Sequence, residues 1–356
     1  KNTRYGPRHG SWYLQSALFR CIVSADNNMA CPKPLLIVSI YHGDGGKGRP
    51  NHSYNTGINA MFAKSFVALV TPFKDDSFDA EAYAKIIAWH IAQGTHGLVP
   101  CGTTGETPVL DMDDYAAVVK TCVDTAKGRV PVMAGAGAND TRKAVQLATT
   151  AESLGADALL VVSPYYNKPT QAGIIAHMKA VHDATNLPIV LYNVPSRTGG
   201  VIETATVIEL AKNFPRIVGI KDASPDLVRP LEMRRALGSD FCLLSGEDAT
   251  VAAYLAQGGD GCISVTANVA PAQCAQLHEA WAAGDRETFN RLRDALLPLH
   301  HAMFCESNPA PAKYALSRLG FCRNELRLPL LPVTDKAAKI IDAAMDGLGL
   351  SAAEAA

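Results

Sequence analysis

Eight short and nearly continuous apolar runs recur along the chain from residue 66 onward. They lack the in-out alternation of a sheet with one wet face, so they predict strands covered on both faces, as in parallel sheets. The predicted strands are residues 66–70, 97–100, 130–134, 158–162, 188–191, 218–220, 242–244 and 262–265.

The segments between these runs carry apolar residues at helical spacing. One such stripe consists of Tyr83, Ile86, Ile87 and Ile91, and Gly94 stands where that helix is expected to stop. Eight strand–helix repeats favour a (β/α)8 barrel over a doubly wound sheet, for which about five to seven strands and a Gly-rich first turn would be expected.

The strand pattern stops after about residue 285. Three helical patterns follow, over residues 285–303, 310–319 and 335–347. We therefore predict an α/β fold: a (β/α)8 TIM barrel over residues 61–284 that carries the catalytic site, and a small C-terminal helical subdomain over residues 285–356.

Residues 1–60 differ in character from the rest of the chain. They hold seven Lys or Arg residues but only two acidic residues, a turn-rich stretch at 43–50, and no sustained helical or strand period. We expect this segment to be an upstream read-through or a dispensable, disordered extension that is not part of the periodic fold. A transit peptide is the alternative, because such segments are rich in Arg and poor in acidic residues.

The charge balance excludes several function classes. Among the 356 residues, 33 Lys and Arg face 34 Asp and Glu, so the net charge is −1, and binding of nucleic acid or anionic lipid by a clustered positive excess is not expected. The longest apolar runs are too short to cross a bilayer. The nine cysteines show no C-x-x-C pair, which indicates reduced thiols, a cytoplasmic protein and no metal site.

Polar residues follow the predicted strands where an active site of a barrel is built, at the carboxyl ends. Lys221 ends the sixth strand and is expected to point into the barrel or just above it. Burial favours the neutral amine, which attacks ketones, so one interpretation is a Schiff-base lysine. The other is a structural ion pair with a carboxylate such as Glu247, since the adjacent Asp222 is expected to face the opposite way.

Hydroxyl groups occupy neighbouring positions at the same barrel end. Thr103 and Thr104 follow the second strand, Tyr166 the fourth, and Tyr192 the fifth. Such groups can relay a proton without introducing a charge, which Schiff-base formation needs in order to expel water from the carbinolamine. Each tyrosine could instead be a packed amphipathic residue, and each threonine a simple turn former.

Five motifs together resemble one enzyme family. They are Gly-Thr-Thr-Gly-Glu at 102–106, Ser-Pro-Tyr-Tyr-Asn-Lys-Pro at 163–169, Leu-Tyr-Asn-Val-Pro-Ser-Arg-Thr-Gly at 191–199, Gly-Ile-Lys-Asp-Ala at 219–223 and Leu-Leu-Ser-Gly-Glu-Asp at 243–248. All occur in the order found in 4-hydroxy-tetrahydrodipicolinate synthases, also called dihydrodipicolinate synthases. The resemblance covers about residues 61–350.

This resemblance implies a class I aldolase-type condensation of pyruvate with L-aspartate 4-semialdehyde, on the way to diaminopimelate and lysine. Lys221 would form the Schiff base and Tyr192 would donate and accept the proton. Thr103 and Tyr166 would complete the relay, with Tyr166 reaching across an interface in a homotetramer built as a dimer of dimers. No cofactor beyond the lysine is implied.

The resemblance also assigns the residues that hold the two substrates. Thr104, Ile263 and Gly246, with backbone groups, would bind pyruvate. Arg197 would receive the carboxylate of the semialdehyde, a task that suits its planar donor fork.

Three alternatives remain. A sibling Schiff-base aldolase, such as an N-acetylneuraminate lyase or a 2-keto-3-deoxy acid aldolase, shares the lysine and tyrosine, although Thr103 and Arg197 favour the synthase. A non-catalytic barrel would be expected to lack Lys221 or Tyr192. A pyridoxal-phosphate enzyme could also use the lysine, but no phosphate loop or pyridinium partner stands out.

The chain departs from lysine-inhibited members of the family at three positions. Those members carry two His residues and one Glu where this chain has Met112, Tyr115 and Lys143. A lysine at 143 would repel the ammonium of the effector, while Asn139 and Tyr165 still match. We expect weak or absent inhibition by lysine.

Overall fold

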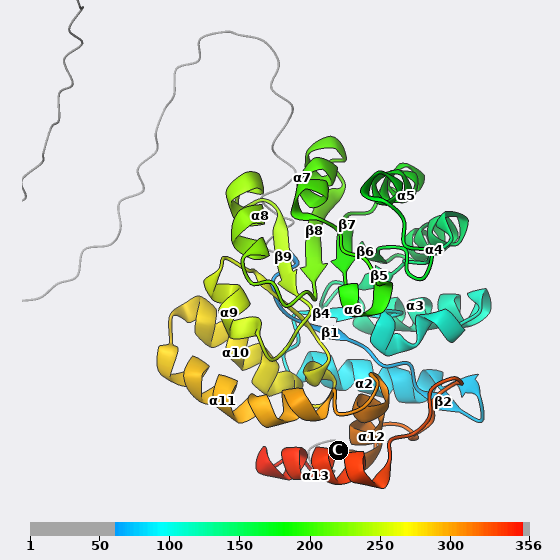
Figure 1. Cartoon of the computed structure of the whole chain (residues 1–356). Helices are drawn as coiled ribbons and strands as arrows, with labels where there is room; N and C mark the ends of the chain where they lie inside the picture. Colours follow the sequence, from blue (N-terminus) through cyan, green and yellow to red (C-terminus); the bar gives the residue numbers. More distant parts are fainter. Residues whose placement is uncertain (1–60, 352–356) are drawn as a thin grey trace, which may run out of the picture. The chain divides into compact units, whose positions relative to one another are not determined.

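The eight predicted strands form one parallel sheet in the order β4-β1-β10-β9-β8-β7-β6-β5. The computed structural model describes residues 61–351, so the expectation for residues 1–60 lies outside the described residues. A parallel bridge between Leu98 and Val132 links the two end strands and brings the sheet round into a nearly closed barrel (Figure 1). The strands are β1 (Lys64–Ala68), β4 (Gly97–Val99), β5 (Met133–Gly135), β6 (Ala158–Val162), β7 (Ile189–Asn193), β8 (Ile217–Asp222), β9 (Cys242–Ser245) and β10 (Gly261–Ser264).

A helix follows each strand and covers the outside of the barrel, which confirms the predicted (β/α)8 architecture (Figure 1). The first of them ends two residues before Gly94, whose φ of 85° only glycine adopts readily. The helices are α2 (Ala80–Ala92), α3 (Met112–Ala126), α4 (Thr141–Ser153), α5 (Gln171–Ala184), α7 (Thr204–Asn213), α8 (Arg229–Leu237), α9 (Val251–Ala256) and α10 (Pro271–Ala283).

Two hydrophobic layers explain why the strands read as continuous apolar runs. Phe66, Leu160, Tyr192 and Ile263 belong to a cluster inside the barrel. The neighbour of Tyr192, Leu191, belongs to the larger cluster between sheet and helices. Because successive side chains point to opposite faces of a strand, each strand must be apolar on both faces except where it ends at the site.

Several strand boundaries differ from the prediction by one or more residues, and two of the shifts have a clear physical reason. The β5 strand begins at Met133 rather than residue 130, because Pro131 has no N–H to donate and the first link to β4 is the bridge at Val132. The β8 strand continues to Asp222, since Lys221 and Asp222 still pair with Leu244 and Ser245 of β9. An apolar pattern alone misses this end of the strand, because its last two residues are charged although their backbones still pair.

A small hairpin was not predicted. It consists of β2 (Phe73–Lys74) and β3 (Ser77–Phe78), which pair antiparallel. Asp75 and Asp76 form its two-residue turn with φ of 53° and 63°, the left-handed geometry that such turns require. Arg323 bonds Asp75 and Arg327 bonds Asp76, so the hairpin is joined to the C-terminal part of the chain.

Three helices follow the barrel where the sequence predicts them: α11 (Arg286–Ala302), α12 (Ala310–Arg318) and α13 (Asp335–Gly347). Short turns also occur at α6 (Pro195–Thr198), η1 (Thr103–Gly105), η2 (Thr107–Val109) and η3 (Thr266–Asn268). The α11 helix packs on α10 and α13, and α12 packs on α13. A division of the chain into domains at residue 284 stays a prediction.

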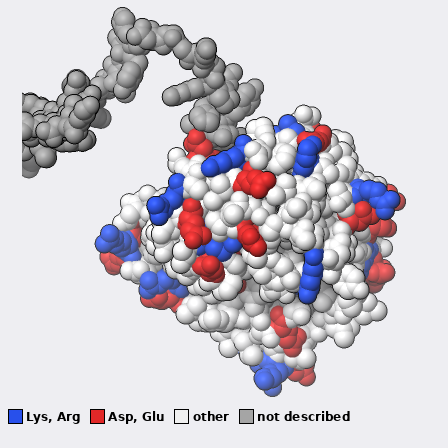
Figure 2. All heavy atoms as spheres, turned by 45° about the horizontal axis from the view of Figure 1, so that its top comes forward, with Lys and Arg blue, Asp and Glu red and all other residues white. Residues whose placement is uncertain are grey.

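Charged side chains of both signs are interspersed on the face drawn in Figure 2, without a large patch of one sign. Between residues 61 and 351, the helices are all too short or too polar to traverse a lipid bilayer.

Close contact between β5 and the loop after β4 generates a stability prediction. A Cβ atom at Gly135 would lie 1.9 Å from the backbone oxygen of Cys101. Gly135→Ala should therefore lower the free energy of unfolding by about 1–3 kcal/mol, measured by urea denaturation. Gly347→Ala is the matched control, because its Cβ would meet nothing within 4 Å. Equal stability of the two variants would contradict the packing described here.

Candidate active site

Lys221 and Tyr192 lie side by side at the carboxyl ends of β8 and β7, where their Cα atoms are register partners. Both side chains are buried, with 5% and 7% of their surface exposed. The Nζ atom of Lys221 lies 4.5 Å from the centre of the Tyr192 ring. Adjacent parallel strands with equal register therefore bring the two residues named from sequence into direct contact.

The alternative of an ion pair between Lys221 and Glu247 is not found. Within residues 61–351, no carboxylate oxygen lies within ion-pair distance of the Lys221 Nζ atom. Burial raises the pKa of Glu247 above its usual value, the Asp248 carboxylate adds to the shift, and Lys221 opposes it. Lys221 is thus a buried amine in contact with an aromatic face, without a neutralising partner.

Gly246 leaves the room that Lys221 occupies. It follows β9, and its backbone N–H donates to the Asp222 carbonyl at 2.7 Å. A Cβ atom there would lie 3.1 Å from Cε of Lys221 and 2.6 Å from Cβ of Ala223. The predicted site residue Gly246 therefore lies against the lysine.

A buried polar network supports the two strand ends from the outside. Asp222 accepts hydrogen bonds from the Asn193 side chain at 2.9 Å and from the Arg229 Nε atom at 2.8 Å. The Asn193 side chain in turn accepts from the backbone of Ile202 at 3.0 Å. Asn193 follows Tyr192 and Asp222 follows Lys221 in the chain, and successive side chains of a strand point to opposite faces. The network outside the barrel therefore helps to hold Tyr192 and Lys221 in register inside it. The sequence pattern alone did not predict that Arg229 belongs to this network.

The threonine turn after β4 forms the 3-10 helix η1. Thr104 is buried, Thr103 is half-buried, and Glu106 ends the turn in a left-handed conformation with φ of 56°. The Glu106 carboxylate forms a fully buried ion pair with Lys313 of α12 at 2.5 Å. Burial lowers the pKa of Lys313, and Glu106 counteracts this effect. Neither partner of this pair was singled out from sequence, because about 200 residues separate them.

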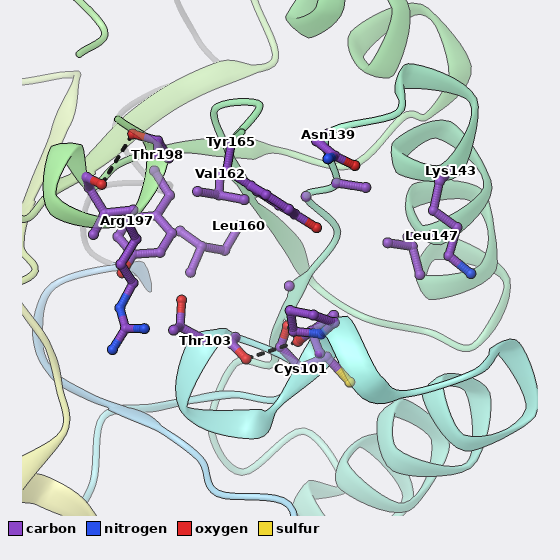
Figure 3. Close-up of a pocket in the computed structure, with 18 of the residues that line it drawn as sticks. Cys101, Thr103, Asn139, Lys143, Leu147, Leu160, Val162, Tyr165, Arg197 and Thr198 are labelled. Carbon is purple, nitrogen blue, oxygen red and sulfur yellow. Dashed lines mark hydrogen bonds between the residues drawn. The ribbon is translucent and has the colours of Figure 1, made fainter. Parts of the chain in front are cut away.

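A cavity of about 560 Å³ opens beside these residues (Figure 3). Thr103 and Arg197 face each other at one end, Lys143 and Leu147 of α4 lie at the other, and Tyr165 lies between. Tyr192 also lines the cavity. Lys221 does not line it and lies against the ring of Tyr192. The cavity thus has a hydroxyl-lined end that could hold a small acid and a second end with a cation.

The remaining predicted residues differ in placement. Arg197 is exposed on α6, and its Nη2 atom donates to the Asn308 carbonyl at 3.4 Å. Ile263 is fully buried inside the barrel and does not line the cavity. Tyr166 is 89% exposed and does not line the cavity, although its neighbour Tyr165 does.

Metal binding has no support in the described part of the chain. Over residues 61–351, no three His, Cys, Asp or Glu side chains gather where they could hold a metal ion. The seven cysteines in this range are free, and five of them are buried.

A sequence model of the Dihydrodipicolinate synthetase family matches residues 61–347. The chain is 54% identical over 290 residues to the 4-hydroxy-tetrahydrodipicolinate synthase of Rhodospirillum centenum, covering 82% of this chain and 99% of that protein. It is 53% identical to the corresponding protein of Parvibaculum lavamentivorans, with 82% and 99% covered.

Solved structures of the same family also match, at lower sequence identity. Dihydrodipicolinate synthase from Aquifex aeolicus is 39% identical with a TM-score of 0.80, covering 82% of this chain and 99% of that one. The chloride-inhibited dihydrodipicolinate synthase from Acinetobacter baumannii, solved in complex with pyruvate, is 42% identical with a TM-score of 0.78, covering 81% and 99%.

The buried Asp222–Arg229 pair generates a double-variant prediction. Arg229→Met should lower the free energy of unfolding by about 3–5 kcal/mol, because it leaves the Asp222 carboxylate buried without a cation. Adding Asp222→Asn should recover part of this loss, since the amide keeps an acceptor for Asn193 without a charge. Urea denaturation of the two single variants and the double variant measures the coupling. Strictly additive losses would show that the two side chains do not interact.

Proposed function

The chain is an enzyme that belongs to the dihydrodipicolinate synthetase family, and we propose that it condenses pyruvate with L-aspartate 4-semialdehyde to give 4-hydroxy-tetrahydrodipicolinate. The observation that carries this proposal is the buried Lys221 amine in contact with Tyr192 at the carboxyl end of the barrel. This reaction belongs to the biosynthesis of diaminopimelate and lysine.

The proposed chemistry begins when the neutral Lys221 amine attacks the keto carbon of pyruvate. The carbinolamine then loses its hydroxyl group as water and becomes a protonated Schiff base. Loss of a methyl proton gives an enamine, whose carbon attacks the aldehyde carbon of the second substrate while the aldehyde oxygen takes up a proton. The amino group of that substrate then replaces the Lys221 nitrogen on the former keto carbon, which closes the ring and frees the lysine. These steps need a proton carrier, and Tyr192, the register partner of Lys221 on the adjacent strand, supplies a hydroxyl group for this role.

Hydroxyl and guanidinium groups at one end of the cavity suit the remaining roles. Thr103 lines the same cavity as Tyr192 and extends the proton relay. Thr104, with backbone groups near Gly246 and Ile263, holds the pyruvate carboxylate. Arg197 receives the carboxylate of the semialdehyde, to which it can present two parallel N–H donors.

Tyr166 indicates that the site is completed by a second copy of the chain. A bulky aromatic residue with φ of 69° and 89% exposure is costly unless a function or an interface compensates. We infer that Tyr166 enters the relay of a neighbouring subunit, in a homotetramer built as a dimer of dimers.

The covalent lysine serves in place of a cofactor in this proposal. The free, mostly buried thiols of residues 61–351 fit a cytoplasmic enzyme.

The proposed function is tested by turnover of both substrates, with the product coupled to a reductase that oxidises NADPH. Wild-type protein should convert both substrates to product. Lys221→Ala should lower the rate of turnover at least about a thousandfold, because no other group supplies the covalent intermediate. Lys212→Ala, an exposed lysine of α7, is the control and should keep full activity. Folded wild-type protein that binds pyruvate covalently but does not turn over would assign it to a sibling aldolase.

The far end of the cavity generates a prediction on inhibition. Lys143 of α4 lines it together with Asn139 and Tyr165, and its ammonium repels a cationic ligand. L-Lysine should therefore not inhibit turnover at micromolar concentration, whereas Lys143→Glu should lower the inhibitory concentration. Lys336→Glu, on the exposed start of α13, should leave it unchanged. Micromolar inhibition of the wild-type enzyme would contradict the prediction.

A further inference from the structure

Asn308 connects the two residues assigned to the two substrate carboxylates. It lies between α11 and α12 and is 5% exposed. Its side-chain Nδ2 atom donates to the hydroxyl oxygen of Thr104 at 3.0 Å, and its backbone oxygen accepts from Arg197 at 3.4 Å. One residue of the C-terminal region thus contacts the η1 turn and α6 at once.

The direction of the first hydrogen bond has a chemical consequence. Because the Thr104 oxygen accepts from Asn308, its own hydrogen is free to donate to another group. A carboxylate can only accept, so this arrangement prepares Thr104 to donate to an acid bound beside it. The contact with the Asn308 carbonyl restrains one end of the flexible Arg197 side chain in a similar way.

A second contact holds the two segments in place. Glu106 lies two residues after Thr104, Lys313 lies five residues after Asn308, and the two form the buried ion pair. The Lys313 Nζ atom also donates to the Glu325 carbonyl at 2.7 Å and lies 4.1 Å from the centre of the Phe73 ring. The Glu106–Lys313 ion pair therefore holds together the same two segments that the Asn308–Thr104 hydrogen bond connects.

The rest of the Asn308 amide shows that it does not serve packing alone. Within residues 61–351, its Oδ1 atom is buried without a hydrogen-bond partner. Such an atom costs free energy that an apolar side chain of similar size would avoid. The polar side chain is explained by its hydrogen bond with Thr104, since the contact with Arg197 uses the backbone carbonyl.

We propose that Asn308 is a positioning residue for both substrates: its amide aims the Thr104 hydroxyl at the pyruvate carboxylate, and its carbonyl holds Arg197 for the semialdehyde carboxylate. This inference rests on the proposed function. It gives the segment between α11 and α12 a role in substrate affinity, although no strand of the barrel leads into that segment.

The test compares Asn308→Asp with Asn308→Ala in full-length protein. Pyruvate is titrated and trapped with borohydride, and the half-saturating concentration is read from the labelled fraction. Asn308→Ala removes the donor and should raise this concentration about fivefold. Asn308→Asp should raise the half-saturating concentration more than tenfold. Its carboxylate cannot donate to Thr104, accepts the Thr104 hydroxyl hydrogen in a hydrogen bond instead, and repels the carboxylate of pyruvate. At saturating substrates, kcat should stay within about threefold of wild type.

The ranking of the two variants separates positioning from packing. Aspartate has the shape of asparagine, so a packing role predicts that alanine is the more harmful substitution, and that result would overturn the proposal. Wild-type half-saturation in both variants would overturn it as well. If only the alanine variant folds, a wild-type half-saturating concentration in that variant overturns the proposal by itself. Asn290→Asp on the surface of α11 is the control. Absence of trapping in the wild-type protein would refute the proposed function instead.

Discussion

A buried amine without a carboxylate partner is the constraint on which the rest of the site depends. The Lys221 side chain is buried, and its Nζ atom lies against the ring of Tyr192. The absence of an ion-pair partner within residues 61–351 keeps the amine available for covalent chemistry. The surrounding structure is organised to tolerate this arrangement: Gly246 leaves space for the lysine, and the network of Asn193, Asp222 and Arg229 holds the strand ends from behind.

The proposed reactive groups and the groups proposed to hold the substrates come from different parts of the chain. Lys221 and Tyr192 lie on adjacent parallel strands, so the barrel register alone sets their separation. Thr104 and Arg197 lie on short turns beyond strand ends, and such turns need restraint from outside the barrel. The C-terminal region supplies it through Asn308 and through the Lys313–Glu106 pair. The helices after the barrel therefore belong to the structure of the site.

The sequence predicted the barrel and placed Lys221 and Tyr192 at the same end of it because both follow from local rules: apolar runs mark buried parallel strands, and catalytic side chains gather at their carboxyl ends. Asn308 and the Lys313–Glu106 pair could not be predicted in the same way, since about 200 residues separate them from their partners and no repeat or motif spacing links them. Tyr166 was predicted as a site residue, yet within one chain it lies outside the cavity. In the proposed homotetramer its contacts would come from a second chain, and a single sequence carries no geometry for such a contact.

The central claim is that Lys221 forms the covalent bond to pyruvate, and peptide mapping after borohydride reduction tests it most directly. Protein incubated with pyruvate and borohydride is digested, and mass spectrometry locates the modified lysine. The account predicts that the adduct lies on the peptide containing Lys221 and on no other lysine peptide. An adduct on a different lysine, with the Lys221 peptide unmodified, would contradict it.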